Sequence, residues 1–478
     1  MDSDNKEEKN MNTRGRKLAI IIIIGVSLYF CPHPSAITDQ AWHLLAIFIA
    51  TILGFILQPI PIGGLAFLSL TITALTGTLK IGEVLSAFSN PSAWLIASAF
   101  LFSRSFNKTN LGRRISFLLI KNFGTSTLKL LYALIVSDMI VAPVTPSNTA
   151  RAGGLFYPIV RSLCSTYGSE PGETSHKIGR FMVQGMFHGD NLISGLYMTA
   201  MAGNPLMVEF VNKIAGTQIT WGSWLLATCV PVGIALIIIP LFMYYFLEIP
   251  EIKETPAAAQ YADKELEKLG PISRAEKWLI LIFVMALLLW STSQWTHINA
   301  TTVAFVAVSA MILTDVLSWS DVIEEKNSWN VLIWMGGLMC LAGFLSKLGL
   351  IPWIAKMVAI ELSSFSWVTA LVIISIAYVV IHYLFASLVA HIAALFSAFF
   401  AVTQVLGAPP YLAAFILIFA NTAMQGLTHY SVGAAPIFYG AGYTTQGEWW
   451  KNGFILTFLE NAILSGVGVI WLKVIGLY

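Results

Sequence analysis

Two long apolar stretches, residues 128–163 and 367–406, are each interrupted near the middle by a short polar segment. The first contains Pro146-Ser147-Asn148-Thr149-Ala150-Arg151 and the second Ala386-Ser387-Leu388-Val389-Ala390-His391, so a serine stands four positions before a basic residue in both. A basic side chain at membrane depth is costly and marks a functional site by default. Each stretch is too long for one crossing, and broken backbone at that depth must lie against protein or water. We therefore predict two re-entrant hairpins whose tips close on one anionic ligand.

The composition excludes a soluble protein. Of 478 residues, 56% are hydrophobic and only 11% are charged, whereas about a quarter of a soluble domain is charged. The four cysteines stand singly, without the spacing of a zinc site or a disulfide framework, so neither a metal nor a cofactor is expected. The basic residues lie in short loops between apolar runs, and we expect a lipid bilayer rather than nucleic acid as the environment.

Apolar length and flanking residues predict an all-α polytopic membrane protein with eleven transmembrane helices besides the two hairpins. The expected spans lie near residues 17–32, 41–58, 62–79, 91–106, 176–203, 221–247, 275–295, 300–317, 329–346, 410–430 and 453–476. Lysine and arginine gather at the N-terminus, at 104–129, at 248–277, and at Lys326 and Lys451. With the N-terminus in the cytoplasm and retained as a first membrane anchor, this order of spans puts all of these basic residues on the cytoplasmic side. Tyr478 then lies on the outer side of the cell membrane.

An internal repeat divides the chain. Asn90–Ile96 resembles Asn327–Ile333, and Leu111-Gly112 recurs as Leu348-Gly349, both 237 positions later, while the two tip serines differ by 240. Five spans and one hairpin in each half require the second half to be inverted. Inverted repeats with helices broken at the midplane are typical of secondary transporters. Chance similarity between apolar segments stays open as the alternative.

Residues 146–154 and 427–436 are similar to the motifs of the divalent-anion/sodium symporter family, especially its exchanger branch of citrate/succinate antiporters and plastid 2-oxoglutarate/malate translocators. The resemblance runs from about Trp42 to the C-terminus. It implies a homodimer in which a transport domain moves like an elevator against a scaffold. On that basis we expect a cytoplasmic tail at 1–16, scaffold segments at 17–126 and 275–365, transport segments at 127–247 and 366–478, and a cytoplasmic linker at 248–274.

The second tip departs from the family's sodium-driven members, in which both tips carry Ser-Asn-Thr and each helps to hold a sodium ion. Leu388 and Val389 offer no side-chain oxygen to a hard cation. Arg151 and His391 stand where the symporters have small polar residues, and we expect these fixed charges to replace sodium. An empty carrier would then have to move unpaired cations through the membrane. This favours obligatory, sodium-independent exchange of C4/C5 dicarboxylates such as 2-oxoglutarate, malate, succinate and fumarate, with a sodium-coupled di- or tricarboxylate symporter as the alternative.

Hydroxyls, amides and helix N-termini suit a dicarboxylate. Together with the resemblance, which places broken helices near 199–205 and 426–436, this makes the candidate substrate residues Ser147, Asn148, Thr149, Arg151, Asn204, Pro205, Ser387, His391, Thr428, His429 and Tyr430. Less specific roles stay open: Arg151 could pair with Asp138, His391 could stay neutral on a helix carbonyl, and His429 and Tyr430 could be satisfied locally. A channel or an intramembrane enzyme fits less well, because the polar residues concentrate at two points and no catalytic motif is present. We expect a transporter, not an enzyme.

Overall fold

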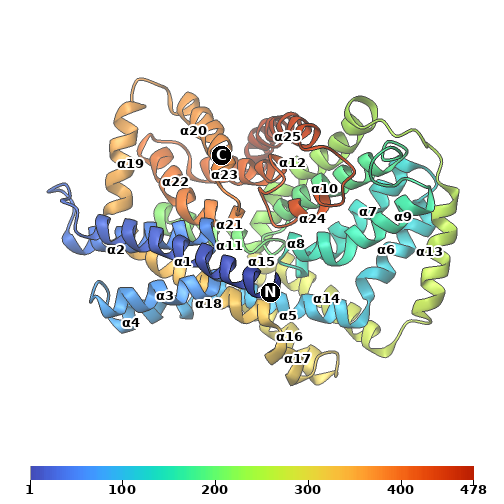
Figure 1. Ribbon diagram of the computed structural model, residues 1–478, viewed down its shortest axis with the longest axis horizontal. Coiled ribbons are helices and arrows are strands. Elements are labelled where there is room, and N and C mark those ends of the chain that lie inside the picture. Colours follow the sequence, from blue (N-terminus) through green and yellow to red (C-terminus); the bar gives the residue numbers. More distant parts are fainter. Residues whose placement is uncertain (1) are drawn as a thin grey trace.

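The computed structural model describes residues 2–478, and their side chains from residue 13 onward except at 294. Within this part the chain is helical, and its only strand-like pairing is an isolated bridge between Ser126 and Glu254 (Figure 1). The expected all-α class is confirmed.

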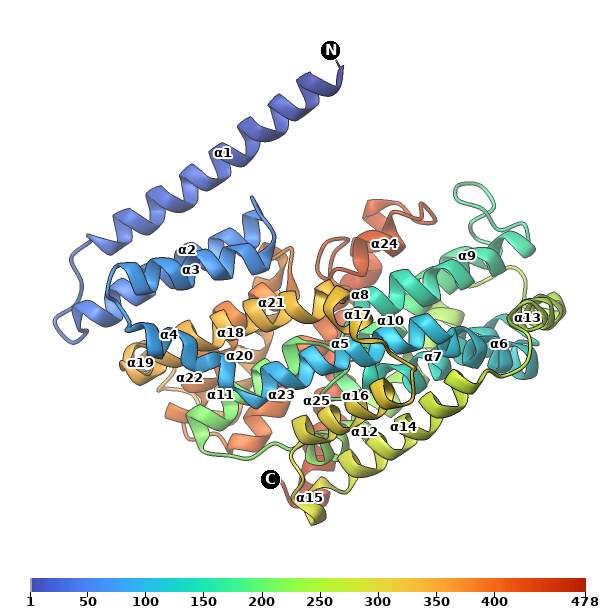
Figure 2. The same ribbon diagram turned by 90° about the horizontal axis from the view of Figure 1, so that it is seen from below.

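The first half of the chain forms twelve α-helices. They are α1 Asp2–Tyr29, α2 Asp39–Leu57, α3 Ile62–Leu75, α4 Ile81–Ser86, α5 Pro91–Thr109, α6 Leu111–Phe123, α7 Thr127–Val141, α8 Asn148–Arg151, α9 Tyr157–Thr166, α10 Gly179–Leu196, α11 Gly203–Ala215 and α12 Trp221–Phe242. The long α1 lies on the outside of the bundle, beside α2 (Figure 2).

Thirteen more helices follow. They are α13 Pro256–Leu269, α14 Arg274–Ser291, α15 Ser293–Thr296, α16 Ala300–Leu313, α17 Trp319–Glu324, α18 Lys326–Lys347, α19 Leu350–Glu361, α20 Trp367–Ile381, α21 Leu388–His391, α22 Ser397–Val405, α23 Pro410–Ala423, α24 Ala435–Tyr439 and α25 Gln446–Val474. Each of the eleven expected spans falls on a helix of this series.

Seven helical segments of the described chain are long and apolar enough to cross a membrane, or eight if α4 and α5, bent by 52° at their junction, count as one. The seven include both arms of the second interrupted stretch, at 367–384 and 388–405. Several expected spans are shorter, such as α3 and α16 with 14 residues each. The number eleven and the orientation in the membrane therefore remain predictions.

Several helices of the first half have a counterpart of similar length in the second half, at nearly the same separation along the chain. Helices α3 and α16 begin and end 238 residues apart, and both are followed by a left-handed residue, Gly77 or Asp315. Helices α7 and α20 begin and end 240 residues apart. The pairing of Leu111 with Leu348 is wrong by two residues, because α6 starts at Leu111 but α19 starts at Leu350. A left-handed residue, Asn110 or Gly349, precedes each of these helices.

The segment between the halves is folded rather than extended. Helix α13 starts at a proline in its first turn and packs against α6, where Asp263 pairs with Lys121 at 2.6 Å and Glu265 with Arg113 at 3.5 Å. Backbone bonds from Thr127 N to Lys253 O and from Thr255 N to Thr125 O join this segment to the start of α7. The expected linker thus ties α6 to the first interrupted stretch.

Candidate functional site

The two tips share one local structure. Ser147 and Ser387 are extended residues whose hydroxyl oxygens accept the backbone N–H of Ala150 and Ala390, at 3.2 and 3.3 Å. Each serine caps a four-residue helix, α8 or α21, which continues through a π-helical turn, 152–156 or 392–396, into α9 or α22. A serine N-cap satisfies a first-turn donor and fixes where the helix begins. The serine-to-basic spacing therefore marks a helix start in both halves.

Arg151 is 1% exposed, and its charge is paired. Its Nε donates to Asp138 Oδ1 at 2.7 Å, its Nη2 lies 3.1 Å from Asp190 Oδ1, and its Nη1 donates to the carbonyls of Thr145 and Ala200 at 2.8 and 2.7 Å. The expectation of an unpaired cation is wrong for this residue, because two carboxylates approach the guanidinium. The pairing with Asp138 that the sequence left open is present, and Asp190 adds to it.

His391 lies in different surroundings. It is buried among Tyr378, Phe385 and His382, and its Nδ1 is 3.1 Å from Nδ1 of His382. Nε2 of His382 lies 2.9 Å from the carbonyl oxygen of Ser431, and if it donates there, His382 Nδ1 is left to accept from His391. Two neutral rings satisfy this geometry, and no carboxylate in the described part of the chain hydrogen-bonds to either. The structure therefore does not support a fixed charge at His391, and it is His382 that bonds a backbone carbonyl.

The first tip is tied to the chain break that follows α23. Asn148 Nδ2 donates to Gln425 Oε1 at 2.9 Å, and Gln425 Nε2 donates to Ser194 Oγ at 2.8 Å. Gly433 approaches so closely that a Cβ there would lie 2.3 Å from Thr149 Oγ1. Gln425 and Ser194 were not among the expected site residues, although Gln425 stands only two residues before the motif at 427–436.

Between α10 and α11 the helix is interrupted over residues 197–202, as predicted. Asn204 Nδ2 donates to the carbonyls of Ser194 and Tyr197 at 2.7 and 3.0 Å, and Ala202 N donates to Pro146 O at 3.1 Å. Freed carbonyls in a buried break require such partners. The amide of Asn204 thus holds the break, and the neighbouring Pro205 sits in the first turn of α11, where no N–H is needed.

The second break spans residues 427–434 and contains the three remaining candidates. Thr428 is 1% exposed, and its Oγ1 accepts from Tyr430 N at 3.3 Å. Tyr430 donates its hydroxyl to Tyr383 O at 2.9 Å, while His429 Nδ1 accepts from Trp450 Nε1 at 3.0 Å. All three polar groups therefore have partners inside the protein.

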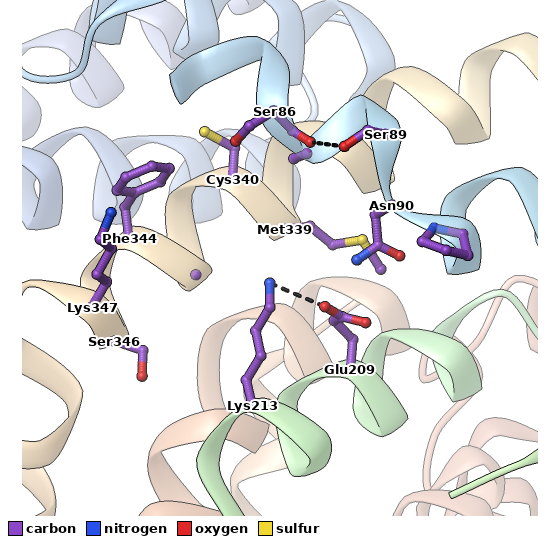
Figure 3. A pocket seen from close by; sticks show the side chains of 13 residues that line it. Ser86, Ser89, Asn90, Glu209, Lys213, Met339, Cys340, Phe344, Ser346 and Lys347 are labelled. Carbon is purple, nitrogen blue, oxygen red and sulfur yellow. Dashed lines mark hydrogen bonds and ion pairs between the residues drawn. The ribbon is translucent and has the colours of Figure 1, made fainter. Parts of the chain in front are cut away.

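An open cavity of about 580 Å³ lies elsewhere, between the start of α5, the helix α11 and the helix α18 (Figure 3). Its lining includes Glu209 and Lys213, paired at 3.1 Å on α11, and Lys347 on α18. None of the candidate substrate residues lines it. The cavity separates a helix of the expected transport segment from one of the expected scaffold.

Comparisons with known proteins bear on the family and on the fold. Residues 12–478 match the family described as sodium:sulfate symporter transmembrane region. A putative malate transporter, YflS of Bacillus subtilis, is 44% identical over 462 residues, covering 96% of each chain. The chloroplast dicarboxylate transporter 1 of Spinacia oleracea is 40% identical, covering 97% of this chain and 82% of that protein. The YdaH transporter of Alcanivorax borkumensis shares the fold, with a TM-score of 0.58 over 97% of both chains at 14% identity.

Proposed function

This chain belongs to the sodium:sulfate symporter family, also called the divalent-anion/sodium symporter family, and we propose that it exchanges C4/C5 dicarboxylates across the membrane without sodium. The substrate class follows the names of relatives that align over nearly the whole chain. The relatives' names do not include a coupling ion, so the proposal about sodium comes from the two tips.

The proposal of sodium independence rests on one observation: the two tips have the same backbone structure but different side chains. In the second tip, Leu388 is buried and Val389 half-buried, and both are hydrocarbon where a hard cation needs oxygen. In the first tip, Ser147 Oγ and Asn148 Oδ1 each already accept a backbone N–H. One of the two acceptor positions of each oxygen is therefore already in use.

Obligatory exchange follows if the groups that balance the charge of the substrate are fixed to the protein. At the starts of α8 and α21 the N–H groups of Thr149, Ala150 and Ala390 are capped by side chains. The N–H groups of Asn148, Leu388 and Val389 have no hydrogen-bond partner among the described residues and suit a carboxylate. They remain with the protein when the substrate leaves, unlike a dissociable sodium ion. We therefore assign the energy barrier against movement of the substrate-free carrier to these unsatisfied N–H donors. Arg151 does not contribute to it, because its charge is paired.

We propose the remaining architecture on the same basis: a homodimer of eleven spans and two re-entrant hairpins, with the repeats inverted and the transport segments 127–247 and 366–478 moving against the scaffold segments 17–126 and 275–365. The constant separations of 238 and 240 residues between matched helices support the duplication. The ligand site would lie between Ser147–Thr149, Ser387, and the breaks containing Asn204–Pro205 and Thr428–Tyr430. Arg151 and His391 would act from behind the tips.

Counterflow in proteoliposomes tests the exchange. Vesicles preloaded with malate should accumulate labelled succinate or 2-oxoglutarate, empty vesicles should not, and replacing external sodium with choline should leave the rate unchanged. Uptake into empty vesicles with a steep sodium dependence would favour the sodium-coupled symporter. Absence of uptake in both would reject dicarboxylates as substrates.

A pair of glycine variants tests the location of the site. Gly433→Ala places a methyl group against Thr149 at the first tip and should lower uptake roughly tenfold, equivalent to about 1.4 kcal/mol. Gly154→Ala is the control, because a Cβ there meets nothing within 4 Å. Equal activity of both variants would place the substrate away from the contact between Thr149 and Gly433.

A further inference from the structure

The surroundings of Arg151 hold more negative than positive charge. Asp138 from α7 and Asp190 from α10 both approach its guanidinium, and all three side chains are 0% exposed. Asp138 Oδ2 and both oxygens of Asp190 accept no hydrogen bond among the described residues, because the 3.1 Å approach of Arg151 to Asp190 lacks hydrogen-bond alignment. Three carboxyl oxygens are thus buried without a donor.

Among the residues whose side chains the structure describes, no second cation balances this group. Helices α12 and α23, which pack against α10, contain no acidic, basic or histidine residue. The basic side chains on elements packed there are paired elsewhere or exposed. Arg180 of α10 pairs with Glu448 at 2.8 Å, Arg161 of α9 with Glu170 at 2.7 Å, and His188 of α10 with Glu460 at 2.7 Å. Lys129 of α7 is exposed, and the basic residues of α6 pair with acidic residues of α13 and α14. One excess negative charge therefore remains fully buried. A buried carboxylate without compensation takes up a proton instead.

We propose that Asp138 and Asp190 bind one exchangeable proton, held on Asp190, which keeps the Arg151 centre neutral beneath the first tip. Asp138 is the ionised partner, because it accepts the short bond from Arg151 Nε. Asp190 then carries an O–H, and Asp138 Oδ2, which otherwise has no donor, is its acceptor. Both carboxyl groups contact the same guanidinium, Asp138 at Nε and Asp190 at Nη2, and this shared partner brings them next to each other.

The proton would regulate the carrier through Arg151. The same guanidinium bonds the carbonyl of Thr145, just before the first tip, and that of Ala200, inside the break between α10 and α11. Losing the proton leaves a net negative charge beneath a tip that receives a dianion. Resting on the proposed function, we expect the KM for succinate to rise roughly tenfold as pH rises through this titration.

Infrared spectroscopy tests the proton without requiring transport. The purified wild-type protein at neutral pH should show a deuterium-sensitive carbonyl band of a protonated carboxylic acid, and Asp190→Asn should lose it. Asp138→Asn should lose it as well, since Asp190 then becomes the sole, ionised partner of Arg151. The surface variant Asp263→Asn, 46% exposed, is the control and should keep the band. Spectra of Asp190→Asn and the wild type that are identical in this region overturn the proposal.

Thermal unfolding provides a second measurement. A carboxyl group that keeps its proton in the folded state, and loses it in the unfolded state, makes stability fall as pH rises. The Tm of the wild type should therefore fall relative to that of Asp190→Asn with rising pH, and parallel curves contradict a bound proton. In vesicles, the KM of Asp190→Asn should be independent of pH over the range where that of the wild type rises. Failure of all dicarboxylate uptake would reject the proposed function but would leave the infrared result standing.

Discussion

At the scale of residues, the difference between the expected and the observed site lies in where charge is compensated. Arg151 is buried as predicted for a functional cation, yet Asp138, Asp190 and two carbonyls surround it. A buried ion pair is expensive to break, because the remaining partner is left uncompensated. Arg151 therefore supports the fold around the first tip whatever it contributes to binding.

Substitution of Arg151 separates these two roles. Arg151→Ala should lower the free energy of unfolding by about 3–5 kcal/mol, because Asp138 and Asp190 lose their shared cation, and should abolish exchange. Adding Asp138→Asn removes one of the stranded carboxylates and should restore part of the stability but not the uptake. Thermal unfolding in detergent and counterflow measure the two effects. If uptake returns together with stability, Arg151 serves only the fold and has no separate role in transport.

At the scale of elements, local sequence was enough to locate most helices. Apolar runs predicted eleven of them, and Ser147 and Ser387 marked the starts of two more, because N-caps and apolar length are local signals. The amphipathic α6 and α19 and the polar α13 were missed as helices, since their stability comes from packing against neighbours.

The same limit applies to the prediction of the site residues. Asp138 is 13 positions from Arg151 and was considered, whereas Gln425 is 277 positions from Asn148, and sequence gives no sign of such a contact.

Helix α17 joins the halves through one charged cluster at the end of α5. Asp321 accepts from Arg104 at 3.0 Å and from Lys108 at 2.6 Å. Burial acts to raise the pKa of Asp321, but hydrogen bonds from Lys108, Ser318 and Arg104 outweigh it and hold the pKa well below its usual value. The carboxylate form is therefore the one that stabilises the contact.

Asp321→Asn should lower stability by about 1 kcal/mol at neutral pH, a modest value because water screens part of the cluster. A lowered pKa contributes stability above the unfolded value of about 4, and this contribution is lost as pH falls through the folded value. The difference in Tm between wild type and variant should therefore shrink below about pH 4. Glu324→Gln, on the same helix but 63% exposed, is the control and should change Tm little. A difference that is constant with pH would mean that Asp321 acts through packing rather than charge.

At the scale of the whole molecule, the contact between α11 and α18 joins the two expected bodies. Helix α11 belongs to the segment 127–247, which carries the first tip, and helix α18 belongs to the segment 275–365. The cavity of about 580 Å³ lies at this contact (Figure 3). If the tips move as one body against a fixed scaffold, this contact must slide during every exchange cycle.

Cross-linking across the contact tests that motion. A Cβ at Gly343 on α18 would lie 3.3 Å from Lys213 Nζ on α11, so cysteines at these two positions are within reach of a short bifunctional thiol reagent. With the native Cys31, Cys164, Cys229 and Cys340 replaced, Gly343→Cys with Lys213→Cys should lose exchange on cross-linking and regain it when a cleavable reagent is reduced. Each single variant should keep its activity under the same treatment, because one anchored reagent cannot join the helices. Undiminished counterflow after complete cross-linking would show that α11 and α18 do not move relative to each other. The boundary between the moving and the fixed segments would then have to lie elsewhere in the chain.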